Sequence, residues 1–128
     1  MKIALFPNFE RAGTTQLLPE IINILTSSGA KCYTFCGANI GLEEKNQNQL
    51  YDECDVILTV GGDGTLIKQA KAAASYLKPC LGINTGRLGF LTNIEKDNLN
   101  LLKKLAFASS IVFPLAEISY PSRLSLIS

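Results

Sequence analysis

The sequence contains no histidine among its 128 residues. Catalytic triads with a histidine base, and zinc sites with histidine ligands, are therefore excluded from this chain. The sequence also lacks an excess of either charge, because its 12 Lys and Arg residues nearly balance its 11 Asp and Glu residues and the formal net charge is +1. Such a chain has no long-range field to attract nucleic acid or an anionic membrane. Any anion must be bound by local geometry.

Paired cysteine motifs and long apolar runs are absent as well. The four cysteines form no Cys-x-x-Cys pair and fit no zinc spacing, so we expect small, buried, reduced side chains. No apolar stretch is long enough to span a bilayer, and Pro7 and Asn8 interrupt the N-terminal run early. We therefore expect a cytoplasmic protein that binds neither nucleic acid nor membrane.

Short apolar runs alternate with segments of helical periodicity. Strands are predicted at residues 2–6, 31–35, 55–60 and 80–83, and helices at 14–29, 65–76 and 96–107, with a short one near 43–50. Strands that alternate with helices pair in parallel through right-handed crossovers. The pattern predicts an α/β fold, with a doubly wound, mostly parallel sheet of about four strands flanked by helices.

The C-terminal stretch differs from this rhythm. Residues 109–128 contain Pro114 and Pro121 between short apolar runs and show no helical periodicity. We interpret residues 1–108 as one α/β domain and residues 109–128 as the start of a second, β-rich domain whose remainder is missing.

A cluster of glycines, GGDGT, follows the predicted strand at 55–60. Gly61 and Gly62 allow a tight turn and let a ligand approach the backbone. We expect the N–H groups of Gly64, Thr65 and Leu66 to be the unpaired donors of the next helix, where the macrodipole favours an anion. The cluster thus predicts a phosphate site without the lysine of a Walker motif.

Charged side chains accompany this turn. Asp63 could accept a proton from an attacking hydroxyl or hold a divalent metal that bridges phosphates. It could equally cap the helix, or belong to a non-catalytic turn that binds adenine, flavin or sugar. Lys68 lies one helical turn past Thr65, so its ammonium could fold back to a phosphate, or simply share a solvated face with Lys71.

A second glycine-rich motif, GINTGRLGF, follows the predicted strand at 80–83. Its spacing is not the G-x-G-x-x-G of dinucleotide oxidoreductases. Asn84 and Thr85 supply short hydrogen-bonding side chains at the carboxyl end of the strand. Arg87 could bind phosphate and Phe90 could lie against an adenine ring, but a surface charge and a core ring are equally good interpretations.

Together, VGGDGTL at 60–66 and GINTGRLGFLT at 82–92 resemble the NAD kinase family. GGDGT alone is shared with lipid kinases such as diacylglycerol and sphingosine kinases, whereas the second motif at this distance is more specific to NAD kinases. The resemblance implies phosphoryl transfer from ATP or polyphosphate to the 2′-hydroxyl of the adenosine ribose of NAD, which gives NADP.

The resemblance also implies site residues. Asp63 matches the proton acceptor of the family and Phe90 an aromatic position near the adenine of NAD. Nucleotide binding is implied for a further set of matching positions: Gly61, Gly62, Gly64, Thr65 and Lys68. Magnesium would be required, because phosphoryl transfer rests on positioning and charge neutralisation. A homo-oligomer is implied for the full-length protein.

One family feature is missing. The second domain of NAD kinases carries an Asn-Glu or Asn-Asp pair that binds the substrate, and neither dipeptide occurs in this sequence. Half of the substrate site is therefore expected to be absent. A lipid-kinase-like domain and a non-catalytic nucleotide-binding module remain as alternative interpretations.

From this absence we predict little or no NADP production by the chain alone. A sensitive assay for NADP, with ATP, magnesium and NAD, measures it. Phosphorylation of a long-chain base or diacylglycerol would favour the lipid-kinase alternative instead. Turnover of NAD at the level of complete family members would contradict the incomplete site.

Overall fold

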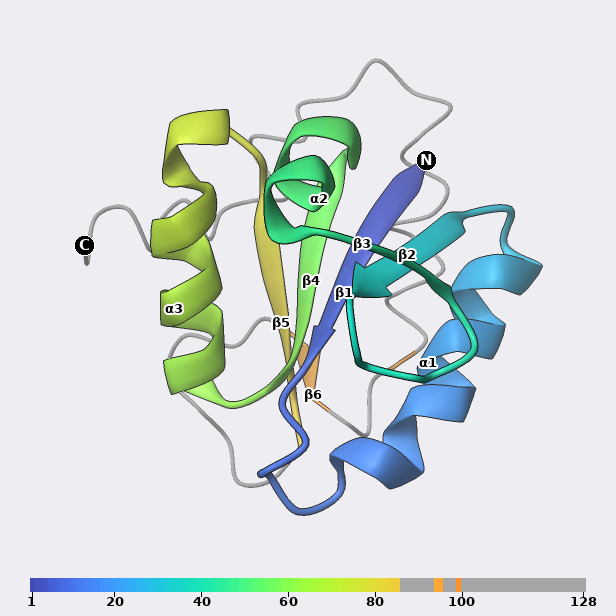
Figure 1. The fold of residues 1–128 in the computed structure, drawn as a ribbon. Helices are drawn as coiled ribbons and strands as arrows, with labels where there is room; N and C mark the ends of the chain where they lie inside the picture. The colour runs from blue at the N-terminus through green and yellow to red at the C-terminus, as the bar shows by residue number, and fades with distance from the viewer. Residues whose placement is uncertain (86–93, 96–98, 100–128) are drawn as a thin grey trace.

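The computed structural model describes residues 1–85, 94–95 and 99, and its centre is one parallel sheet (Figure 1). The strand order is β3-β2-β1-β4-β5-β6, and every neighbouring pair runs parallel. The strands are β1 Lys2–Pro7, β2 Lys31–Phe35, β3 Glu43–Lys45, β4 Val56–Gly61, β5 Cys80–Asn84 and β6 Ile94–Glu95. The helices are α1 Thr14–Ser27, α2 Gln47–Glu53 and α3 Asp63–Ala73, followed by a 3-10 turn, η1 Ala74–Tyr76.

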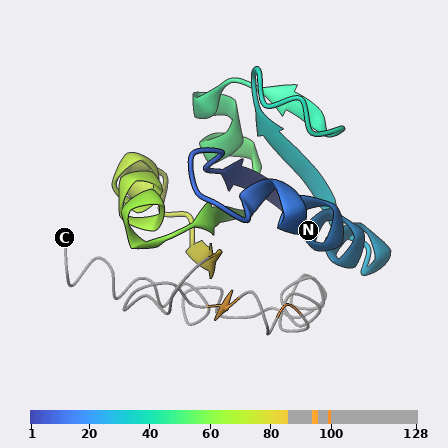
Figure 2. The ribbon, with the colours of Figure 1, turned by 90° about the horizontal axis from the view of Figure 1, so that it is seen from below.

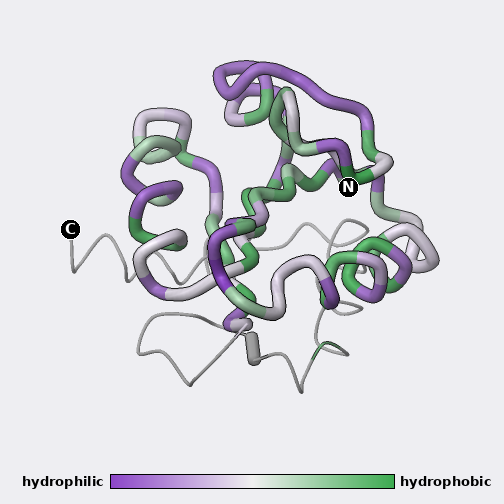
Figure 3. Tube along the Cα trace, turned by 60° about the horizontal axis from the view of Figure 1, so that its bottom comes forward, coloured by the Kyte–Doolittle hydropathy of each residue, from purple (hydrophilic) through white to green (hydrophobic). Residues whose placement is uncertain are grey.

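Helices cover both faces of the sheet, as a view along it shows (Figure 2). On one face, α1 packs Leu18, Ile21 and Leu25 against alternate residues of the central strands. On the other face, α2 and α3 pack Leu50, Leu66 and other side chains against the remaining alternate residues. The central strands are therefore buried on both faces and mostly apolar, and Figure 3 shows this hydrophobic centre inside a more polar exterior.

The predicted fold class is confirmed, and the sheet is larger than expected. The described residues form six strands where about four were predicted, because β3 and β6 have only 3 and 2 residues and carry too little pattern to be recognised. The helix predicted near 43–50 is wrong in its bounds: Glu43–Lys45 is a strand, and α2 begins at Gln47.

Two local interactions explain this difference. Asn46 and Gln49 form a reciprocal capping box, which fixes the start of α2 after the strand. Just before it, the Glu44 carboxylate accepts the N–H groups of Gly37 and Asn39 at 3.0 and 2.9 Å. These bonds lower the pKa of Glu44 and hold the loop between β2 and β3 in place.

Several predictions fall on residues that the structure does not describe. They are the helix at 96–107, the second domain at 109–128, Arg87 and Phe90. Leu99 is the one described position in this region beyond β6, and it is buried in the cluster on the α1 face. Among the described helices, none has the length and apolar character needed to cross a membrane.

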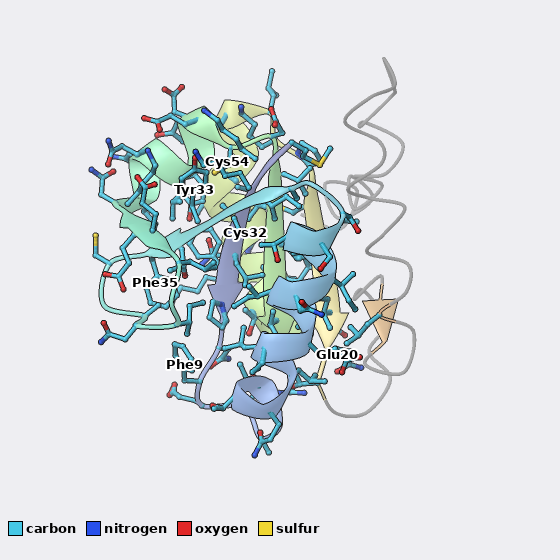
Figure 4. All side chains as sticks on the ribbon, turned by 90° about the vertical axis from the view of Figure 1, so that its right-hand side faces the viewer. Phe9, Glu20, Cys32, Tyr33, Phe35 and Cys54 are labelled. Atoms are coloured by element: carbon cyan, nitrogen blue, oxygen red, sulfur yellow. The ribbon has the colours of Figure 1, made fainter. Side chains whose placement is uncertain are left out.

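The cysteines differ in exposure, although all four are free thiols. Cys32, Cys54 and Cys80 are buried as expected, and Cys32 and Cys54 lie among the side chains of Figure 4. Cys36 is exposed, which corrects the expectation of four buried thiols. It directly follows the last residue of β2 and lies in a turn on the surface. Burial raises the pKa of Cys32 and Cys54 to about 11 and of Cys80 to about 12.

We predict that a thiol-alkylating reagent at about pH 8 modifies Cys36 alone in the folded chain, because the thiolate is the reactive form. The other three thiols should react only after urea unfolding, since burial both blocks them and disfavours their thiolates. Intact-mass spectrometry counts the labels, and Cys36→Ser is the control that should remain unlabelled when folded. Labelling of a second thiol in the folded chain would contradict the burial.

Candidate functional site

The candidate site lies at the topological switch point of the sheet, where the order in which the chain adds strands changes direction. β1 and β4 are neighbours at the centre of the sheet, and the chain leaves β1 towards β2 on one side and β4 towards β5 on the other. In such sheets the two connections diverge and leave a crevice at the carboxyl ends of the strands. The loop after β1 and the GGDGT turn after β4 both lie at this point.

The GGDGT turn leads directly into α3. The helix begins at Asp63, two residues earlier than predicted, and Gly62 is its N-cap. The N–H of Leu66 donates to the carbonyl of Gly62 at 3.2 Å, so Leu66 is not one of the open donors, which corrects that expectation. The N–H groups of the first turn, including those of Gly64 and Thr65, have no carbonyl within the helix to bond.

Asp63 is the first residue of α3 and is partly buried. It is not the N-cap, and the cap residue Gly62 offers no side chain, so the simple capping interpretation of Asp63 is not supported. Its carboxylate belongs to the first turn, where the dipole of the helix stabilises negative charge.

Asn8 ties the loop after β1 to the start of α3. Its N–H donates to the carbonyl of Val60 at 2.8 Å, and its side-chain amide donates to Thr65 Oγ1 at 2.9 Å. A Cβ atom at Gly61 would lie 2.6 Å from Thr65 Oγ1 and 3.2 Å from the Cβ of Asn8. Gly61 is therefore needed for the close approach of these two segments.

Arg11 lies over the next glycine. A Cβ atom at Gly62 would lie 2.7 Å from one terminal nitrogen of the Arg11 guanidinium and 2.9 Å from its central carbon. The bare backbone of Gly62 thus gives the guanidinium its place beside the start of α3. This brings a permanent positive charge to the end of the helix where anions are favoured.

A pocket of about 220 Å³ opens between these elements. Its lining consists of Asn8, Arg11, Gly62, Gly64, Thr65 and Lys68. Four of these were predicted from the sequence, and the structure brings them together. Asn8 and Arg11 were missed. Their loop faces the same crevice because β1 lies next to β4, and that neighbourhood comes from the strand order and not from a local sequence pattern.

Asn84 and Thr85 lie beneath the turn and do not line the pocket. Both are buried, with 2% and 4% of their surfaces exposed. The N–H of Thr85 donates to the carbonyl of Gly61 at 2.9 Å, which fixes the second motif to the first. A direct contact of either side chain with a ligand stays a prediction.

The chemistry of the pocket suits phosphate. Two cationic side chains, Arg11 and Lys68, and the first turn of α3 line it. Asp63 is the sequence neighbour of the lining residues Gly62 and Gly64 but is not itself among the lining residues. Within the described residues no three His, Cys, Asp or Glu side chains gather into a metal cluster. Fold and pocket together define an α/β protein with a glycine-rich turn and a cationic pocket at its topological switch point.

Comparisons with known proteins identify the family. A model of the ATP-NAD kinase N-terminal domain matches residues 26–107, more than half of the chain. The NAD kinase of Caldicellulosiruptor bescii is 34% identical over 112 residues, which cover 84% of this chain and 40% of that protein. The NAD kinase of Helicobacter hepaticus is 48% identical over 64 residues, or 50% of this chain and 21% of that protein. The chain belongs to the NAD kinase family.

A solved structure agrees in fold. Yeast NADH kinase complexed with NADH matches with a TM-score of 0.64 and 17% identity, over 85% of this chain and 38% of that chain. The chain spans less than half the length of the curated relatives that it matches.

We predict that the three glycines of the turn respond differently to alanine. Gly61→Ala should lower the free energy of unfolding by about 1–3 kcal/mol, because its Cβ meets Thr65 and Asn8. Gly62→Ala should cost less, since the flexible end of Arg11 can move. Gly64→Ala, the matched control, meets nothing within 4 Å and should stabilise α3 by up to about 1 kcal/mol. Urea unfolding measures all three, and equal effects would contradict this packing.

Proposed function

We propose that this chain supplies the phosphate-binding turn and the proton acceptor of an NAD kinase. The reaction transfers a phosphoryl group from ATP or polyphosphate to the 2′-hydroxyl of the adenosine ribose of NAD and gives NADP. The observation that carries the proposal is the cationic pocket at the switch point, because two of its lining residues, Gly62 and Gly64, directly flank Asp63 in the first turn of α3. Membership of the NAD kinase family supports the choice of substrate.

In this proposal the pocket holds the phosphates of the donor. The N–H groups of Gly64 and Thr65 donate to phosphate oxygens, and Arg11 and Lys68 neutralise their charge. The bond from Asn8 to Thr65 keeps the loop and the helix at a fixed separation. Fixed donors matter because phosphoryl transfer depends on positioning and on electrostatic stabilisation of the transferring group.

Asp63 acts as the general base. Its carboxylate accepts the proton of the ribose 2′-hydroxyl as the hydroxyl oxygen attacks the terminal phosphorus, and the bond to the bridging oxygen of the donor breaks. The acid lies at the first residue of α3, so it adjoins the amides that hold the phosphates. A general base contributes roughly 10²–10⁴-fold to such a rate.

The residues fit a magnesium ion that is carried by the nucleotide. Mg²⁺ is usually held by one or two carboxylates together with substrate phosphates and water, and Asp63 is the acid beside the pocket. When bound, the ion would neutralise charge on the phosphates.

We also propose a cytoplasmic location and a homo-oligomer for the full-length protein. Four free thiols, three of them buried, fit a reducing compartment. The oligomer is the expectation that the family resemblance raised.

The two alternative functions differ in their support. A lipid-kinase-like domain would share GGDGT, but the family match and the second motif, anchored by Thr85 to Gly61, favour NAD kinase. A non-catalytic nucleotide-binding module would keep the pocket and gain nothing from Asp63.

Asp63→Asn separates catalysis from binding, and we predict opposite effects on the two. In any preparation that forms NADP, kcat should fall by roughly 10²–10⁴-fold, because the amide cannot accept the proton. The Kd for ATP should stay the same or tighten, since a negative charge beside the phosphates is removed. A coupled NADP assay and calorimetric titration measure these quantities. Unchanged kcat would support the non-catalytic module, and lost ATP binding would give Asp63 a structural role.

A further inference from the structure

An exposed aromatic pair borders the phosphate pocket on the β2 side. Phe9 directly follows Asn8, which lines the pocket, and 44% of its surface is exposed. Its ring meets the ring of Phe35 edge to face, with centroids 6.4 Å apart and an interplanar angle of 66°. Figure 4 shows the two residues at the carboxyl end of the sheet, with α1 and Glu20 on the other side.

Packing does not account for the exposure of Phe9. Phe35 already stacks on Phe6 at 6.0 Å, and Phe6 stacks on Tyr51 at 5.8 Å, so the buried aromatic cluster is complete without Phe9. Phe9 adds an outer ring to this cluster and leaves much of its surface to solvent. Only one other large hydrophobic side chain among the described residues is so exposed, and that is Leu77, beyond the far end of α3.

The end of β2 carries an aromatic ring where dinucleotide-binding sheets usually carry an acid for the ribose hydroxyls. Here that position is Phe35, and the nearby Glu44 has both carboxylate oxygens bonded to the N–H groups of Gly37 and Asn39. The end of β2 therefore offers an aromatic surface, which suits a flat apolar group, in place of a free carboxylate. A nucleobase is such a group, and it stacks on exposed aromatic rings.

The loop after β1 connects the aromatic pair to the phosphate pocket. The proposed function places the phosphates of the donor in the pocket that Asn8 and Arg11 line, and Phe9 lies between these two residues in the same loop. The ligand part assigned to Phe9 is therefore the base of the donor and not the acceptor.

We propose that Phe9, supported by Phe35, is the base-stacking platform for the phosphoryl donor, whose phosphates occupy the pocket lined by Asn8 and Arg11. The inference rests on the proposed function and deepens it, because it makes the donor a nucleoside triphosphate and not inorganic polyphosphate. In this proposal the loop Asn8–Arg11 contacts both the phosphates and the base of the donor. Asn8 and Arg11 line the pocket for the phosphates, and Phe9 between them meets the base.

The test compares ATP with inorganic triphosphate, which lacks the base, by calorimetric titration of the 128-residue chain with magnesium present. Phe9→Ala should weaken ATP roughly tenfold and leave triphosphate unchanged, because only the base loses its partner. Phe9→Leu should behave like Phe9→Ala, since it keeps apolar volume but offers no ring face, and Phe9→Tyr should retain ATP binding. Leu77→Ala is the matched control and should change neither ligand.

Each other result overturns the inference. Equal weakening of ATP and triphosphate would mean that Phe9 only supports the loop, and no change in either would mean that the base lies elsewhere. Weaker NAD binding with unchanged ATP binding would assign the platform to the acceptor. If the unaltered chain bound neither ATP nor triphosphate, the phosphate pocket of the proposed function would fail, and the platform would fail with it.

A second measurement uses the unaltered chain, so it tests the proposal even if a Phe9 variant does not fold. Proton NMR of the unaltered chain with ATP should show nuclear Overhauser effects between the adenine protons and the ring of Phe9. Effects from the adenine to other residues alone would overturn the assignment.

Discussion

The site depends on how closely the loop after β1 approaches the turn after β4. Asn8 reaches Thr65 at 2.9 Å, and the guanidinium of Arg11 lies so close to Gly62 that a Cβ atom there would force it to move. Two successive glycines, which have no side chains, allow the two segments to come this close. Gly61 makes room for the hydrogen bond and Gly62 makes room for the cation. The same bare backbone leaves the first turn of α3 accessible, so one constraint both joins the loops and opens the anion site.

This constraint explains why the two glycine motifs belong together. The second motif begins in β5, and the N–H of Thr85 bonds to the carbonyl of Gly61 at 2.9 Å. The end of β4 is therefore held from both neighbouring strands. On the side of β1 the N–H of Asn8 donates to the carbonyl of Val60, and on the side of β5 the N–H of Thr85 donates to the carbonyl of Gly61. A turn fixed in this way can present amides to a phosphate without reorganisation, which is the form of electrostatic stabilisation that enzymes use.

The sequence predicts the parallel sheet and four of the six pocket-lining residues for a definable reason. Continuous apolar runs such as VILTV mark strands buried on both faces, and the glycines after them mark the carboxyl ends. Asn8 and Arg11 escape prediction because their role depends on β1 lying next to β4, and strand order is not visible in a local pattern. The start of α3 was not predicted correctly for a different reason. Its N-cap is a glycine without a side-chain hydrogen bond, and such a residue resembles a loop residue in the sequence.

The position of Asp63 follows from the same helix start. Were α3 to begin at Thr65, Asp63 would be a loop residue outside the helix, and its carboxylate would be free to cap the first turn. Because the helix begins at Asp63 itself, the acid is part of the rigid element whose amides face the pocket. Its separation from any phosphate bound there is then set by the helix backbone and not by a loop. A carboxylate in the same helical turn as the amides that would hold a phosphate repels that phosphate, and the proposed catalytic task gives a reason to keep it there.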